Sequence, residues 1–175
     1  MMNADETPSH MTQHESKEAS APPTLWVDAD ACPGPVKELV LKAAHRHLLQ
    51  TVWVANQALW LPPNERTTLV QVAQGSDEAD AYIVAHAQPG DLVVTQDILL
   101  AEQLVARAIF VISPYGTVFT RQTIGERVSV RNHLDLLRGA GLVTGGPKPF
   151  GPKQKQQFAN ALDKTLTQCL RQAGR

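Results

Sequence analysis

Leu25-Trp26-Val27-Asp28-Ala29-Asp30-Ala31-Cys32-Pro33 is the most informative stretch of the chain, because an apolar run ends in two carboxylates and a helix start, Gly34-Pro35, follows at once. The apolar run predicts a buried strand over residues 25–29, in which residues two apart project to the same side. Asp28 and Asp30 are therefore expected together near the C-terminal end of the strand, where open α/β sheets bind ligands. Two neighbouring carboxylates are costly without a positive partner, and a hard divalent cation is the usual one.

Outside this stretch, the chain has the composition of an ordinary globular protein. Its 175 residues, 43% of them hydrophobic, predict one domain over residues 25–171, preceded by a polar, disordered extension over residues 1–24. Its two cysteines, Cys32 and Cys169, are too few for a disulfide framework, which is typical of a reducing, cytoplasmic location. There is no apolar run of about 18 residues and no apolar N-terminal signal segment, so we expect neither a membrane span nor secretion.

Strands alternate with helices over most of the chain. The pattern predicts, in order, a strand at 25–29, a helix at 35–49, a strand at 51–55, a loop at 56–67, a strand at 69–73, a helix from 75–77 to 87, a strand at 91–95, a helix at 98–108 and a strand at 108–112. We therefore expect an α/β fold with an open, mostly parallel sheet of about five strands and helices on both faces. After Pro114, a short extended piece at 117–120 and helices at 123–138 and 153–171 predict a helical extension.

Further acids occur at comparable places in the pattern. Asp97 follows the strand at 91–95, and Asp77 and Asp80 lie on one face at the start of a helix. If the first and fourth strands are adjacent, these acids meet Asp28 and Asp30 where the strand order reverses. Such an oxygen-rich cluster suits Mg²⁺ or Mn²⁺, with Asp28, Asp77, Asp80 and Asp97 as expected ligands and Asp30 beside them. Alternatively, Asp77 and Asp97 serve only as helix N-caps.

The charge of the chain is unevenly distributed. Residues 1–110 contain 6 Lys/Arg and 14 Asp/Glu, net −8, whereas residues 111–175 contain 10 and 3, net +7. This asymmetry suits a protein that holds cations at one site and polyanions beside it, although unevenly charged solvated faces are the alternative. Expected contacts to water or substrate near the strand ends are Asn56, Thr95 and Gln96. Expected phosphate contacts from a basic tail that begins near residue 121 are Arg121, Arg127, Arg131, Lys148 and Lys153.

Four stretches together resemble a known family. They are VDADACP (27–33), GSDEADAYIV (75–84), DLVVTQDILLAEQLV (91–105) and GGPKPF (145–150), and they are similar to the YaiI/YqxD family of small bacterial proteins over about residues 25–166. That family in turn resembles PIN-like nuclease domains in its strand-end Asp, its helix-start Asp and its V-V-T-x-D pattern. The resemblance implies a PIN-like fold and Mg²⁺- or Mn²⁺-dependent hydrolysis of RNA. It matches Asp28, Asp80 and Asp97 to the acids of the hydrolytic site, with Asp30 and Asp77 as extra candidates. The expected catalytic acids are Asp28, Asp30, Asp80 and Asp97.

Two other functions fit the same residues. Haloacid-dehalogenase-like phosphatases use a strand-end D-x-D, which makes Asp28 a nucleophile and Asp30 a general acid, but no suitable lysine follows a later strand. A nucleic-acid-binding or regulatory module without catalysis also fits the charge asymmetry. The sequence leaves open whether the chain forms a homo-oligomer.

Overall fold

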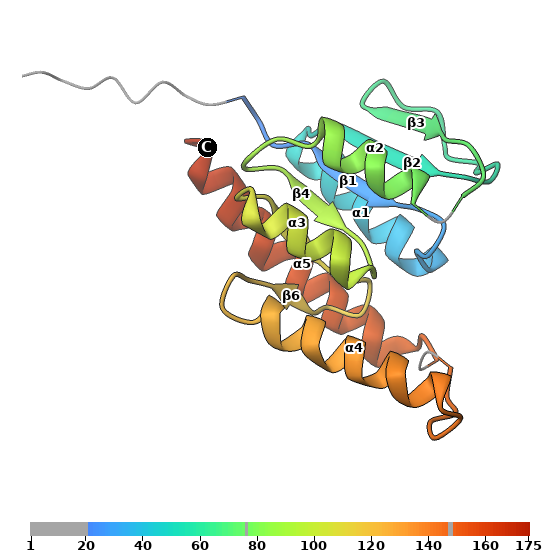
Figure 1. Ribbon diagram of the computed structural model, residues 1–175. Helices are drawn as coiled ribbons and strands as arrows, with labels where there is room; N and C mark the ends of the chain where they lie inside the picture. The colour runs from blue at the N-terminus through green and yellow to red at the C-terminus, as the bar shows by residue number, and fades with distance from the viewer. Residues whose placement is uncertain (1–20, 76, 147–148) are drawn as a thin grey trace, which may run out of the picture.

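The computed structural model describes residues 21–75, 77–146 and 149–175, which form a sheet with helices on both faces (Figure 1). In chain order the elements are β1 Leu25–Asp28, α1 Gly34–His47, β2 Thr51–Ala55, β3 Thr67–Gln71, α2 Glu78–His86, β4 Leu92–Val94, α3 Ile98–Ala106, β5 Phe110–Ile112, β6 Val118–Phe119, α4 Ile124–Gly139 and α5 Pro152–Gln172. The alternation predicted from the sequence is confirmed.

The strand order is β3-β2-β1-β4-β5-β6. The strands β1 to β5 pair in parallel, so the sheet is open and mostly parallel, and β1 lies beside β4. The order reverses between β1 and β4, which places a ligand-binding edge at the carboxyl ends of these two strands. This adjacency is the condition that the predicted carboxylate cluster requires.

The sheet has six described strands where the sequence predicts about five. The extended piece expected at 117–120 forms β6, which pairs antiparallel with β5. The turn between β5 and β6 requires glycine at position 116. Its φ is +84°, which glycine adopts readily, and an added Cβ would lie 2.6 Å from the backbone of Gln157 in α5.

The two faces of the sheet are covered by different pairs of helices (Figure 1). Side chains alternate along β1: Leu25 and Val27 pack with α1 and α5, whereas Trp26 packs with α2 and α3. Phe158 of α5 is fully buried in the first of these cores. The helix α5, the last of the predicted extension, is therefore part of the domain and covers one face of the sheet. Asp28 follows Trp26 by two residues and so faces α2 and α3.

Most element boundaries differ from those predicted by one or two residues, and two of the differences have a clear cause. β3 begins two residues earlier than expected, because it pairs along the whole of β2, from Thr51 opposite Thr67 to Ala55 opposite Gln71. Residues 1–20 of the predicted N-terminal extension lie outside the described residues. Thr24, the last residue of that extension, belongs to the fold, because its carbonyl oxygen accepts a hydrogen bond from the Leu92 N–H.

Asp91 lies at the opposite edge of the sheet from Asp28. Its carboxylate is buried and accepts hydrogen bonds from Thr24 N, Trp26 Nε1 and Gln88 N at 2.8–2.9 Å. Three donors compensate for the burial of this charge, so Asp91 has a structural role. Among the described helices, none is long and apolar enough to cross a membrane.

Candidate active site at a cavity of carboxylates

Asp28 is held at the end of β1 by the neighbouring strand. Thr95, which follows β4, donates a hydrogen bond from Oγ1 to Asp28 Oδ2 at 2.9 Å and accepts one from the Asp97 N–H at 3.0 Å. Thr95 is only 1% exposed. Its predicted contact with substrate is therefore corrected to a supporting role: it fixes the Asp28 carboxylate from within the protein.

The four predicted catalytic acids surround one cavity of about 350 Å³, here called the acid cavity. Its lining consists of Asp28, Asp30, Ala31, Asn56, Ala79, Asp80, Gln96 and Asp97. The predicted contacts Asn56 and Gln96 thus lie in its wall, whereas none of the described residues in that wall is basic. Ala31 and Ala79, which the sequence analysis did not single out, have small side chains that leave room between the acids.

Of the other predicted acids, Asp30 and Asp97 line the cavity and Asp77 lies outside its lining. Asp30 accepts a hydrogen bond from the Asn56 N–H at 2.7 Å. Asp97 is the N-cap of α3, where Oδ1 accepts from Leu99 N and Leu100 N, so the predicted capping role is confirmed even though Asp97 also lines the cavity. Asp77 is the N-cap residue of α2 but makes no side-chain cap bond, and it is exposed outside the cavity lining.

Burial and mutual repulsion disfavour the charged forms of two of these acids. Burial raises the pKa of Asp28; its hydrogen bond from Thr95 lowers that pKa, and the charges of Asp30 and Asp97 raise it. Burial also raises the pKa of Asp80, to about 7, and Asp97, Asp28 and Asp77 add to the shift. The acid cavity is therefore a place of concentrated negative charge that a cation would relieve.

The donor set fits a hard cation, because carboxylate oxygens are the ligands that Mg²⁺ and Mn²⁺ prefer. As placed, however, no three His, Cys, Asp or Glu side chains in the described ranges form a group that could hold a metal ion. The acids surround a space rather than converge on one point. Metal binding by Asp28, Asp77, Asp80 and Asp97 thus stays a prediction.

Cys32 lies next to this edge but does not offer a reactive thiolate. Its side chain is buried, and burial raises the pKa of its thiol to about 12. The thiol is therefore protonated at neutral pH, and nucleophilic sulfur chemistry is not supported here.

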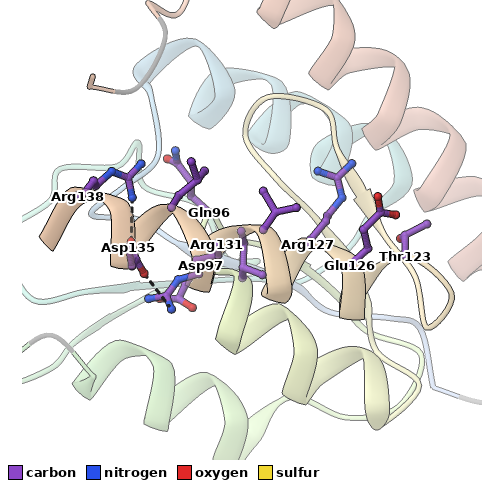
Figure 2. A pocket seen from close by; sticks show the side chains of 11 residues that line it. Gln96, Asp97, Thr123, Glu126, Arg127, Arg131, Asp135 and Arg138 are labelled. Atoms are coloured by element: carbon purple, nitrogen blue, oxygen red, sulfur yellow. Dashed lines mark hydrogen bonds and ion pairs between the residues drawn. The ribbon is translucent and has the colours of Figure 1, made fainter. Parts of the chain in front are cut away.

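A second cavity of about 660 Å³, here called the α4 groove, lies between the start of α3 and the length of α4 (Figure 2). It shares Gln96 and Asp97 with the acid cavity, so the two lie next to each other. Of the predicted phosphate contacts, Arg127 and Arg131 line this groove. Arg138 lines it as well; the sequence analysis missed it, although its spacing of seven residues from Arg131 places both on one helix face.

The other predicted phosphate contacts lie elsewhere. Arg121 donates a hydrogen bond to the Ala106 carbonyl at the end of α3, and Lys153 is exposed at the start of α5. Neither lines the α4 groove or the acid cavity. Lys148 lies outside the described residues.

Known proteins related to this chain share most of its length. The family model described as "Uncharacterized BCR, YaiI/YqxD family" matches residues 26–168. A protein named "UPF0178 protein" from Myxococcus xanthus is 50% identical over 147 residues, covering 84% of this chain and 96% of the relative. Proteins with the same name from Syntrophobacter fumaroxidans and Psychromonas ingrahamii are 46% and 49% identical over 143 residues, covering 82% of this chain and 94% and 95% of the relatives. No solved structure matches the chain significantly.

Proposed function

The chain belongs to the YaiI/YqxD family. We propose that it is a divalent-metal-dependent nuclease that hydrolyses RNA phosphodiester bonds at the acid cavity. One observation carries the proposal. Asp28, Asp30, Asp80 and Asp97 come from three segments far apart in the sequence, yet all line one cavity whose described lining contains no basic side chain. Retaining four acids in one cavity costs free energy, and a cation-dependent reaction accounts for that cost.

The residues of the chain prepare this cavity in separate ways. Thr95 and the backbone N–H of Asn56 fix one oxygen each of Asp28 and Asp30, so these carboxylates need little reordering. Asp80 approaches from α2, and Asp97 is anchored by its cap bonds at the start of α3. The amides of Asn56 and Gln96 can donate hydrogen bonds to a phosphate or to water in the cavity.

A bound Mg²⁺ or Mn²⁺ would supply activation of water and neutralisation of charge on the phosphate. In the reaction, a bond forms between the water oxygen and phosphorus, and the phosphorus–oxygen bond of the strand breaks. Asp28, Asp80 and Asp97 are the proposed ligands; Asp30 in the lining, and Asp77 outside it, add to the negative surroundings. The groove arginines are not needed for this step.

The proposal predicts cleavage that depends strictly on the cation. Metal-stripped protein should leave a labelled single-stranded RNA intact, and addition of Mn²⁺ or Mg²⁺ should start cleavage that a chelator stops. Gel analysis of the products over time provides the measurement. Equal cleavage with and without the chelator, or none under any metal condition, would reject the nuclease.

A second candidate, a nucleic-acid-binding module without catalysis, is favoured by the spacing of the acids. No three metal-ligating side chains in the described ranges are placed to hold an ion. In that case, removing an acid would leave RNA binding unchanged or strengthen it, because one charge that repels phosphate is gone. The phosphatase alternative has less support, because the described lining of the cavity contains no lysine.

A further inference from the structure

The helix α4 buries little of its apolar surface. Ile124 alone among its 16 residues is buried, while Val130 is 53% exposed and Leu136 is 74% exposed. Figure 1 shows α4 at one edge of the molecule, beyond β6. Helices in proteins are stabilised mainly by packing an apolar face against a partner, so much of α4 is left without that stabilisation in a single copy.

Four residues of α4 that line the groove form one stripe with a spacing of four residues. In order they are Glu126, Val130, Leu134 and Arg138. Residues four apart form a ridge along a helix, and ridges of this kind interlock in the commonest helix-packing class. The stripe reads acid, apolar, apolar, base. In reverse it reads base, apolar, apolar, acid, so it is complementary to itself when two copies run antiparallel.

The charge balance of the groove decides against a polyanion as its occupant. Its lining contains three arginines and three acids, which cancel: Arg127, Arg131, Arg138, Asp97, Glu126 and Asp135. Asp135 pairs with Arg138 at 2.8 Å and with Arg131 at 3.5 Å, as Figure 2 shows. Arg127 lies over the Phe119 ring, with its guanidinium carbon 5.8 Å from the ring centroid. A nucleic-acid surface instead needs an excess of positive charge.

We propose that the α4 groove is the interface of a homodimer, in which the α4 helices of two copies pack antiparallel. Glu126 of each copy faces Arg138 of the other, and Val130 of each faces Leu134 of the other. A two-fold axis passes between Val130 and Leu134, midway along the stripe, and makes the interface isologous. Because the groove shares Gln96 and Asp97 with the acid cavity, the dimer brings two such cavities to the borders of one interface.

The test is the mass of the full-length protein in solution, measured by sedimentation equilibrium at micromolar concentrations. The wild type should give about twice the 19.1 kDa of one chain. Leu134→Asp should raise the dimer dissociation constant by at least about thirtyfold, as expected for a central apolar contact. Leu142→Asp is the matched control: Leu142 is 72% exposed outside the groove, and its change should leave the constant within about twofold.

A charge exchange tests the antiparallel arrangement without burying a new charge. Glu126 and Arg138 are both exposed, so replacing them should leave the fold intact. Glu126→Arg and Arg138→Glu alone should each weaken the dimer several-fold, and the double variant should restore it, because each new base again faces a new acid. Unchanged thermal unfolding confirms that each variant is folded.

The proposal is independent of the nuclease proposal, and it fails on any of three results. The first is a monomeric wild type at all concentrations. The second is a dimer that responds alike to Leu134→Asp and Leu142→Asp, or that the double exchange does not restore. The third is an unchanged mass in every variant together with weaker binding of a single-stranded oligonucleotide, which would assign the groove to nucleic acid.

Discussion

Replacing Asp28 with asparagine is expected to lower RNA cleavage by roughly 10²–10³-fold, the loss typical of removing one preorganised electrostatic contact. The change keeps the shape of the side chain and its hydrogen bond from Thr95, but removes a charge that the acid cavity needs to hold a cation. Without metal, the variant should be at least as stable as the wild type, because Asp28 is partly buried among other acids. Product formation at saturating Mn²⁺ measures the first effect, and thermal unfolding in chelator measures the second.

Asp163→Asn is the matched control for this experiment. Asp163 is an exposed acid of α5 that pairs with exposed Arg46 at 3.1 Å, a surface ion pair of small energetic value. The control makes the same chemical change outside the cavity and should keep wild-type cleavage. If Asp28→Asn retains cleavage while it unfolds like the wild type, the acid cavity is not the hydrolytic site. If neither protein cleaves and both bind RNA, the binding module is the better description.

Much of the position of these acids follows from the sequence, because it depends on local patterns once β1 and β4 are adjacent. Strand alternation places Asp28 and Asp30 on one side, and the order of strands and helices brings Asp97 to the neighbouring strand end. The same pattern separates Asp91 from this cluster, because Asp91 precedes its strand and lies at the opposite edge of the sheet. A helix start likewise predicted the capping role of Asp97.

The features that the sequence did not predict depend on how distant segments pack. The ends of β3 follow its pairing with β2, and β6 exists because the turn at Gly116 fits against α5. The groove exists because α4 packs beside the start of α3, which no periodicity within α4 indicates. For the same reason, the sequence could not separate Arg127 and Arg131, which line the groove, from Arg121 and Lys153, which do not.

Replacing Asp80 with asparagine is expected to stabilise the metal-free protein at pH 8 by about 1–2 kcal/mol. The pKa of Asp80 is raised to about 7 from an ordinary value of 3.8. Between these values the folded protein binds more protons than the unfolded chain, so the carboxyl makes stability fall as pH rises through this range. One pKa unit corresponds to about 1.4 kcal/mol, and screening by water at this partly exposed group reduces the full effect.

The same variant should lose the stabilisation that a cation provides. For the wild type, a ligand at about 100 times its dissociation constant stabilises the fold by about 2.7 kcal/mol. Mn²⁺ should raise the free energy of unfolding of Asp80→Asn much less than that of the wild type. Without metal, the variant should be more stable than the wild type at both pH values, and this difference at pH 5 should be less than half of the difference at pH 8. Denaturant unfolding of both proteins at the two pH values, with and without Mn²⁺, measures these differences. A gain that is equal at both pH values would show that Asp80 is ordinarily ionised in the folded protein.

Direct measurement of Mn²⁺ binding shows whether the acid cavity holds a divalent cation. Free Mn²⁺ is followed by electron paramagnetic resonance as metal is added to stripped wild type, Asp28→Asn and Asp163→Asn. We predict saturable binding by the wild type and Asp163→Asn that is tighter at pH 8 than at pH 6, because the cation displaces the Asp80 proton. Asp28→Asn should bind at least about tenfold more weakly. Absence of saturable binding up to millimolar Mn²⁺, or equal binding by all three proteins, would show that the acid cavity is not a cation site.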